Sequence, residues 1–380
     1  MAFFRSNAMA SGTGPMITSF QVVKQHLARW RWERHPLGRA TAEGQLLVAI
    51  TRFAFTSNNV TYARLGVQIP YWQFFPAGDG WGRIPVWGVG RIERSSHPRY
   101  RQGEAVYGYF PMDSHALLQP GSRSGVCFID ATPHRRELPP TYNEYVLIDR
   151  DHSYDRSHAD AHLVLRPLFS LAFFCATFLK ERQYFGARQV IVTSASSKTA
   201  LGLAFLLSRA RSAGDAIEIV GLTSSANAAF VRARAVCDRV LTYDAIGSLP
   251  LEASALIDLG GEVKLRAAVH GRLRDALRYS ALAGFTHWDA LRVGDASLPG
   301  PEPTLFFTPH HILRLRREWG PGVLRARLAE AWRAYLAFVD PWLRYEHRAT
   351  RAGVEAAYAE VLSGKTPPSN AHILTIPAGA

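Results

Sequence analysis

Hydroxyl side chains cluster in a turn between a buried strand and an apolar helix, in the stretch VIVTSASSKTALGLAFLL at 190–207. The residues of this turn that could do chemistry are Ser194, Ser196, Ser197, Lys198 and Thr199. A helix N-terminus that follows a strand carries unpaired N–H groups and a positive dipole end, and dinucleotide phosphates bind there. The chemistry that these residue types favour is therefore phosphate binding.

The turn contains no glycine, which leaves three interpretations. A P-loop needs two glycines before its Lys-Thr pair, and only the pair Lys198-Thr199 is present. A dinucleotide turn also normally uses glycines, but serine and alanine are their smallest replacements. A plain corner would need one serine to cap the helix and would gain nothing from Lys198, whose charge opposes the helix dipole when no anion is bound. We favour a dinucleotide cradle made of hydroxyls, with Lys198 directed at the phosphates.

The next predicted strand and its end, IEIVGLTSS at 217–225, bear on the kind of dinucleotide. An Asp or Glu at this end would hold the ribose 2′-hydroxyl of NAD. Thr223 and Ser224 stand there instead, with Arg232 and Arg234 further along. Hydroxyls with nearby arginines fit the 2′-phosphate of NADP better, whereas a solvated loop without a ligand is the alternative.

The aromatic residues between 71 and 87 also need an explanation. They could form a glycine-hinged lid over a planar or apolar substrate, or they could pack a long loop onto its domain; they are Tyr71, Trp72, Phe74, Phe75, Trp81 and Trp87. We expect the pair His310-His311 and the strand end at Asp258 to be structural, since adjacent histidines on a helix point apart.

Composition narrows the class of protein. The chain has 380 residues and a formal net charge of +13, but its basic residues are scattered and only five are lysine, so we expect no nucleic-acid partner. No apolar run reaches the roughly 18 residues of a membrane span, so we expect no membrane partner either. Three cysteines, far apart in the sequence, favour a reduced, cytoplasmic protein and provide no metal spacing.

The order of predicted elements indicates an α/β protein with one domain inserted into another. We expect a disordered tail over 1–16, a β-rich domain over 17–162, a doubly wound parallel domain over 163–300, and a return to the first domain over 301–380. The strand at 189–193 is apolar on both faces and should lie centrally in the parallel sheet. The other expected strands are 45–53, 86–93, 104–110, 144–148, 216–221, 238–242, 253–258, 280–284, 304–307 and 371–376. The expected helices are 167–182, 199–211, 225–235, 309–340 and 351–363.

Four stretches together resemble the medium-chain dehydrogenase/reductase superfamily, in its zinc-free, quinone-oxidoreductase-like branch. They are QLLVAITRFAFTSNNVTYARLG (45–66), PVWGVGRIERSSHPRYRQGEAVYGYF (85–110), TYNEYVLI (141–148) and VEAAYAEVLSGKTPPSNAHILTI (354–376). Within the superfamily, the SASSKTA turn and the TSNNVTYARLG stretch are similar to an uncharacterised family known as a domain of unknown function. The resemblance implies a β-rich, partly open barrel (GroES-like) that forms the catalytic domain, with an inserted Rossmann-type cofactor domain.

The chain departs from the superfamily at its functional motifs. The glycine-rich turn falls on Ser194, Ser197 and Ala200, so all three glycines are missing. The Gly-His-Glu zinc signature is absent from 85–90, and the cysteines of a structural zinc lobe are absent too.

The resemblance also indicates catalytic candidates. Tyr62 is similar in position to the tyrosine that lines the active site of quinone oxidoreductases, and Asn58 and Asn59 stand beside it. A reductase without a metal needs such donors to stabilise a developing oxyanion. An Asx-type turn with Tyr62 packed into the core is the alternative.

The function that these observations favour is a zinc-independent, NADP-dependent reduction of a carbonyl or conjugated double bond in a small apolar molecule. A lyase-like enzyme without redox chemistry and a non-catalytic sensor on the same fold stay open, because the phosphate turn lacks glycine. The sequence also leaves a homodimer open.

Zinc content gives a direct test. We expect purified protein to contain no stoichiometric zinc, and a chelator to leave its activity intact, because no ligand set of suitable spacing exists. Elemental analysis that finds about one zinc per chain would overturn this expectation.

Overall fold

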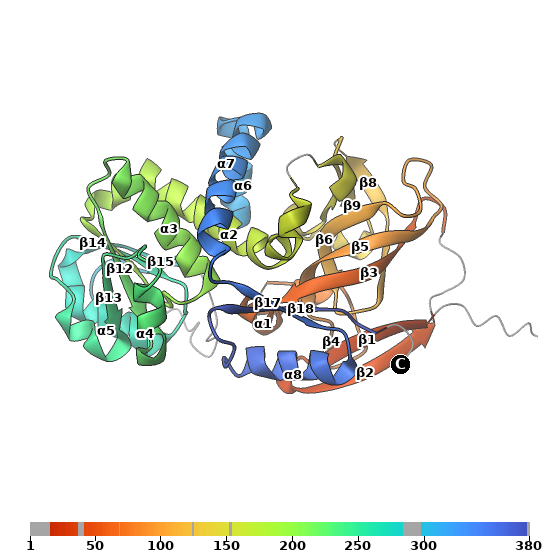
Figure 1. The fold of residues 1–380 in the computed structure, drawn as a ribbon, viewed down its shortest axis with the longest axis horizontal. Coiled ribbons are helices and arrows are strands. Elements are labelled where there is room, and N and C mark those ends of the chain that lie inside the picture. Colours follow the sequence, from red (N-terminus) through yellow and green to blue (C-terminus); the bar gives the residue numbers. More distant parts are fainter. Residues whose placement is uncertain are drawn as a thin grey trace, which may run out of the picture.

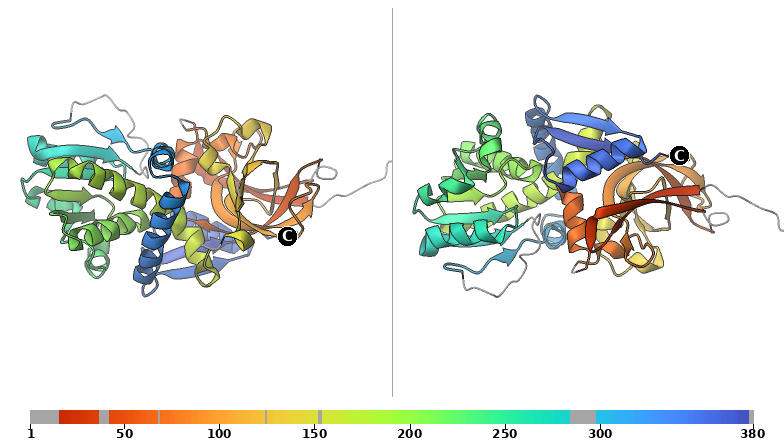
Figure 2. Two further views of the ribbon diagram at one scale, coloured as in Figure 1. Left: turned by 90° about the horizontal axis from the view of Figure 1, so that it is seen from above. Right: turned by 90° about the horizontal axis from the view of Figure 1, so that it is seen from below.

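Two lobes lie side by side in the computed structural model, which describes residues 16–36, 42–67, 69–123, 125–151, 154–283 and 298–377 (Figure 1). One lobe is rich in β-strands and the other is a parallel sheet covered by helices. Helix α2 (Ala159–Glu181) and the pair α6 (Thr308–Glu318) and α7 (Pro321–Val339) lie where the lobes meet, as the views from above and below also show (Figure 2).

The β-rich lobe is built from two sheets. The larger has nine strands in the order β17-β18-β3-β5-β6-β10-β9-β8, with β7 paired to β3, and the smaller has the order β2-β1-β4. All their pairs are antiparallel except β17 with β18. The strands are β1 (Met16–Val23), β2 (His26–Pro36), β3 (Leu46–Phe55), β4 (Trp81–Gly82), β5 (Pro85–Ser95), β6 (Ala105–Pro111), β7 (His115–Leu118), β8 (Pro120–Arg123), β9 (Cys127–Asp130), β10 (Glu144–Leu147), β17 (Arg344–Arg348) and β18 (Asn370–Leu374). Helices α1 (Ser57–Leu65) and α8 (Arg351–Leu362) belong to the same lobe.

The second lobe is a six-stranded parallel sheet in the order β13-β12-β11-β14-β15-β16. Its strands are β11 (Gln189–Val192), β12 (Glu218–Thr223), β13 (Arg239–Thr242), β14 (Ser254–Asp258), β15 (Leu277–Leu282) and β16 (Thr304–Leu305), and its helices include α3 (Lys198–Ser212), α4 (Ser225–Arg232) and α5 (Val263–Leu273). Numbered within the lobe, the strand order is that of the Rossmann fold, which binds dinucleotides where the order reverses, between β11 and β14.

The fold class expected from the sequence is confirmed. Strand β11 lies inside the sheet, as its apolar run predicts, and its four residues are all buried. Strands β12, β15, β16 and β18 and helix α4 are displaced by a few residues from their expected ranges, because hydrogen-bond partners, not hydropathy, decide where a strand ends.

Helix α2 differs most from its prediction. It begins at Ala159, so the expected domain boundary at 162/163 falls inside it, and Pro167 lies within it, close to where the expected helix began. The described residues contain one helical segment, Arg156–Glu181, that is long and apolar enough to cross a membrane. This segment packs as a core helix between the lobes, with Leu163 and Leu179 fully buried.

The sequence did not predict the β1–β2 hairpin or β17, and it missed helix α1. Strand β2 reads HLARWRWERHP, an alternation in which Trp30 and Trp32 pack on the ring of Phe20. That period of two is a strand signal, but the charged residues between the aromatics made the segment resemble a loop.

Candidate functional site

A cavity of about 750 Å³ joins the two groups of residues that the sequence singled out. Its walls come from both lobes and from α2, α6 and α7. The residues that line it include Asn58, Tyr62, Tyr71, Trp87, Tyr107, Tyr142, Arg166, Ser194, Ser196, Ser197, Lys198 and Thr199. The cavity therefore connects the tyrosine of the β-rich lobe with the turn after β11.

The phenolic oxygen of Tyr62 accepts two hydrogen bonds at this cavity. Asn58 stands one helical turn earlier on α1 and donates its Nδ2–H across 2.7 Å. Trp87, from β5, donates its Nε1–H across 3.2 Å. Among the described residues no group accepts the proton of Tyr62, which is left to be donated to a bound molecule.

The surroundings of Tyr62 keep that proton in place at neutral pH. Burial raises the pKa of Tyr62 well above its usual range, and the neighbouring phenol of Tyr142 raises it further. The bonds from Trp87 and Asn58 oppose this rise because they stabilise the phenolate. Tyr62 can therefore act as a neutral donor whose developing negative charge is met by two N–H groups.

Asn59 does not take part, contrary to our expectation. It is 3% exposed, its Oδ1 accepts the backbone N–H of Thr56 at 2.8 Å, and its Nδ2 donates to the carbonyl of Pro85 at 2.9 Å. These bonds cap α1 and fasten it to β5. The residue thus positions the helix, and its side chain does not line the cavity.

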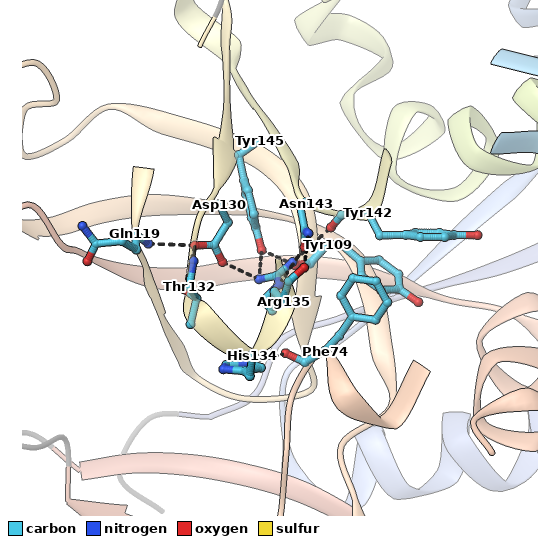
Figure 3. Close-up of polar contacts among 10 residues, drawn as sticks. All are labelled: Phe74, Tyr109, Gln119, Asp130, Thr132, His134, Arg135, Tyr142, Asn143 and Tyr145. Atoms are coloured by element: carbon cyan, nitrogen blue, oxygen red, sulfur yellow. Dashed lines mark hydrogen bonds and ion pairs between the residues drawn. The ribbon is translucent and has the colours of Figure 1, made fainter. Parts of the chain in front are cut away.

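Beside Tyr62, a pair of tyrosines forms the neighbouring wall of the cavity. The hydroxyls of Tyr71 and Tyr142 lie 3.0 Å apart. Arg135 is 2% exposed and holds the main chain at Tyr142 by donating to its carbonyl at 3.0 Å, while it also bonds to Asp130 at 2.7 Å and Asn143 at 2.8 Å (Figure 3). Both carboxylate oxygens of Asp130 accept hydrogen bonds, so this buried ion pair holds the wall in position.

Packing, not a lid, accounts for the other aromatics of the 71–87 segment. Trp72, Phe74 and Phe75 are buried, and Trp72 lies so close to Gly66 and Gly82 that a Cβ at either position would meet its ring at 2.2 and 2.5 Å. Only Tyr71 and Trp87 of the six aromatic residues reach the cavity.

In the turn after β11, a serine adopts a backbone conformation that is usual for glycine. Ser194 has a φ of +49°, in the left-handed region that glycine usually occupies. Its hydroxyl lies beside Gly260, where an added Cβ would come within 2.7 Å of Ser194 Oγ. The Ser194 side chain thus fits because Gly260, after the neighbouring strand β14, has no side chain of its own.

The other serines of the turn have partners. Ser197 caps α3, since its Oγ accepts the N–H of Ala200 at 3.2 Å, and Ser196 Oγ accepts a bond from Asn227 at 3.1 Å. The capping role assigned to a serine in the plain-corner interpretation is therefore present at Ser197. Ser194, Ser196 and Thr199 nevertheless line the cavity.

Lys198 is directed elsewhere than we expect from the sequence. Its ammonium donates to the carbonyls of Asn370 at 2.6 Å and Pro368 at 3.3 Å, at the start of β18. Tyr335 of α7 donates to the carbonyl of Lys198 at 3.1 Å. These bonds fasten the first turn of α3 to the β-rich lobe. The ammonium of Lys198 therefore binds carbonyl oxygens where we expected it to bind a phosphate.

Two hydroxyls at the end of β12 lie outside the cavity lining. Thr223 Oγ1 is buried and has no hydrogen-bond partner among the described residues, and the side chain of Ser224, the N-cap residue before α4, makes no capping bond. The two arginines further along do not support them: Arg232 bonds to the carbonyl of Val240, and Arg234 lies over the rings of Phe230 and Trp342.

Asp258 is structural, as expected. Its carboxylate accepts the N–H groups of Gly260 and Gly261 at 3.1 and 2.9 Å and pairs with Arg266 at 3.0 Å. Thr193 joins this buried network at 2.8 Å. The network holds the loop where the strand order of the sheet reverses.

The described residues contain no group of three or more His, Cys, Asp or Glu side chains that could hold a metal ion. Elemental analysis of the purified protein is the test of its metal content.

Comparison with known proteins identifies the family. Residues 53–367 match the family model described as "Protein of unknown function (DUF2855)". The chain belongs to this family. None of the curated proteins matches the sequence.

Solved structures show the same fold at low identity. CurA from Vibrio vulnificus in complex with NADPH is 13% identical, with a TM-score of 0.61, and 94% of this chain covers 98% of that one. A putative NADPH:quinone reductase from Mesorhizobium loti is 12% identical, with a TM-score of 0.58, and 97% of this chain covers 100% of it. TarJ from S. aureus in complex with NADPH is 13% identical, with a TM-score of 0.53, and the coverage is 95% and 99%. These matches confirm the fold that the sequence predicted, a β-rich lobe joined to a Rossmann-type lobe.

The buried ammonium of Lys198 predicts a pH dependence of stability. Burial lowers its pKa from 10.5 to about 8, so the unfolded chain keeps this proton to higher pH than the folded chain does. The contribution of Lys198 to the free energy of unfolding therefore rises with pH from about 8 to about 10.5. The free energy of unfolding in urea should rise by about 1–2 kcal/mol more in the natural protein than in Lys198→Met between roughly pH 7.5 and 9.5. A difference between the two proteins that stays constant or shrinks over this interval would contradict the buried contact.

Proposed function

We propose that this protein is a zinc-independent, NADP-dependent oxidoreductase that reduces a carbonyl or a conjugated double bond of a small molecule. The observation that supports this most is that Tyr62 and the turn after β11 line the same cavity. The similar structures of CurA and TarJ are complexes with NADPH, which supports the same cofactor here.

The residues at the turn fit the phosphates of such a cofactor. Ser194, Ser196 and Thr199 line the cavity at the start of α3, whose first N–H groups have no partner within the helix. Beyond the cavity lining, Ser224 at the end of β12 makes no capping bond and stands where a carboxylate would repel a 2′-phosphate. When bound, NADPH would supply a hydride.

The chain's own contribution to the reaction centres on Tyr62. Its hydroxyl would donate to the carbonyl oxygen of the substrate and stabilise the charge that develops there. Asn58 and Trp87 meet the charge that passes to the phenolic oxygen, and the walls of Tyr71 and Tyr142 exclude water from the reacting atoms.

A lyase-like enzyme or a sensor without bound cofactor is the second candidate. The observations that favour it are the capping role of Ser197 and the engagement of Lys198 with carbonyl groups. The left-handed Ser194 and the space at Gly260 favour the cofactor-dependent proposal instead, because the turn keeps the backbone shape that brings a phosphate close.

Replacement of Tyr62 by Phe tests the proposed chemistry. We expect kcat with NADPH and an enone to fall by about 100- to 1000-fold, since one oxyanion donor is removed. Binding of NADPH and the melting temperature should change little, because the ring remains in place. Asn58→Leu, which removes one of the two supporting bonds, should give a smaller loss. An unchanged kcat in Tyr62→Phe would rule out this tyrosine as the donor.

Replacement of Ser224 by Asp tests the cofactor assignment. A carboxylate at this position would repel a 2′-phosphate and accept a bond from a 2′-hydroxyl, so the ratio of NADPH to NADH affinity should invert or approach one. Ser225→Asp is a matched control, since Ser225 is an exposed neighbour on α4. Equal affinity of the natural protein for both cofactors would contradict the assignment.

A further inference from the structure

We propose that the substrate carries a carboxylate and that Arg166 binds it. The inference rests on the proposed function and specifies the substrate class: a planar conjugated ketone or aldehyde with an acidic group at one end.

One face of α2 forms a wall of the cavity and presents Arg166 at the end of that wall. Pro167, Ser170, Leu171 and Phe174 follow at helical spacing and all line the cavity. The guanidinium of Arg166 lies 5.1 Å from the ring centre of Tyr107 on β6. Arg166 is therefore the charged end of a wall that is otherwise largely apolar.

Aromatic contacts connect Arg166 with the catalytic candidate. Tyr107 stacks on Trp87, with ring centres 5.7 Å apart and planes inclined by 17°. Trp87 in turn donates to Tyr62 at 3.2 Å. A flat substrate lying along these rings can have its carbonyl oxygen at Tyr62 and a second polar group at Arg166.

The guanidinium has unused hydrogen-bonding capacity. Its Nη1 is buried and has no hydrogen-bond partner among the described residues. Asp151 is the carboxylate that pairs with it, at 3.9 Å, which is too long for a hydrogen bond. A buried N–H group without an acceptor costs free energy, and a carboxylate satisfies a guanidinium with two parallel bonds.

The charges around the cavity favour an anion. The described lining residues include the cations Arg166, Lys198, Arg316 and Arg325 and the carboxylates Glu144 and Asp151. Glu144 pairs with Arg316 at 3.5 Å, and Lys198 is held by carbonyl groups. Arg166 is thus the cation that combines a partly buried side chain, a place beside the rings and an N–H group without an acceptor among the described residues.

A phosphate of the cofactor is the other source of an anion. Arg166 lies over a strand of the β-rich lobe, whereas the turn that fits phosphate follows β11 in the other lobe. Affinity for NADPH should therefore not depend on Arg166.

Calorimetric titration of the full chain with benzalacetone and with its para-carboxylate tests the proposal without turnover. In Arg166→Met the dissociation constant of the carboxylate should rise by about 10- to 100-fold. The constants for neutral benzalacetone and for NADPH should change less than about twofold. Arg166→Lys, which keeps the charge but not the planar fork, should be intermediate, and Asp151→Asn should tighten binding of the carboxylate.

Arg325→Met is the charge-matched control, because Arg325 is exposed at the rim of the cavity. An equal loss of carboxylate binding in Arg166→Met and Arg325→Met would overturn the proposal and assign the effect to the net charge of the cavity. A loss confined to NADPH would assign Arg166 to the cofactor. Failure of the natural protein to reduce neutral benzalacetone would count against the proposed function alone, since these binding measurements do not depend on reduction.

Discussion

The phenolic oxygen of Tyr62 accepts two hydrogen bonds and so has a proton left to donate, and the organisation of the site depends on this arrangement. One bond comes from the same helix, one turn away, and the other from a strand of the large sheet. Helix α1 must therefore stay fixed against β5, and the bonds of Asn59 to Thr56 and Pro85 provide this. The β-rich lobe acts as a rigid support that keeps one hydroxyl proton available in an apolar cavity.

The second requirement is that the two lobes keep a fixed relation, since the cavity has walls in both. Helix α2 packs against each lobe, with Asp160 near its start paired to Arg52 of β3 at 3.2 Å. Lys198 adds a second contact between the lobes, from the first turn of α3 to the start of β18. Because this ammonium neighbours the turn proposed to bind phosphate, the junction of the lobes and the proposed cofactor site share one structural element.

Much of this could be predicted from the sequence. The alternation of apolar strands and helices predicted the parallel sheet, and the resemblance indicated Tyr62 and Asn58 as site residues. Their hydrogen bond could not be predicted, because helix α1, which sets them at i and i+4, was not expected. The directions of Asn59 and Lys198 could not be predicted, because each is decided by backbone carbonyls that lie far away in the sequence, at Pro85 and Asn370. Trp87 was noticed only as one aromatic among several, and Arg166 was hidden in an apolar helix, where only the fold shows that its side chain faces a cavity.

We propose that a turn without glycine still binds NADP beside Tyr62. Calorimetric titration of the natural protein with NADPH and with NADH can decide this. We predict one NADPH site per chain and an affinity for NADH that is weaker by at least about tenfold. NADH lacks the 2′-phosphate, so the charge-assisted hydrogen bonds to that group are lost. Failure of both nucleotides to bind would contradict the proposal and favour a cofactor-free function for this cavity.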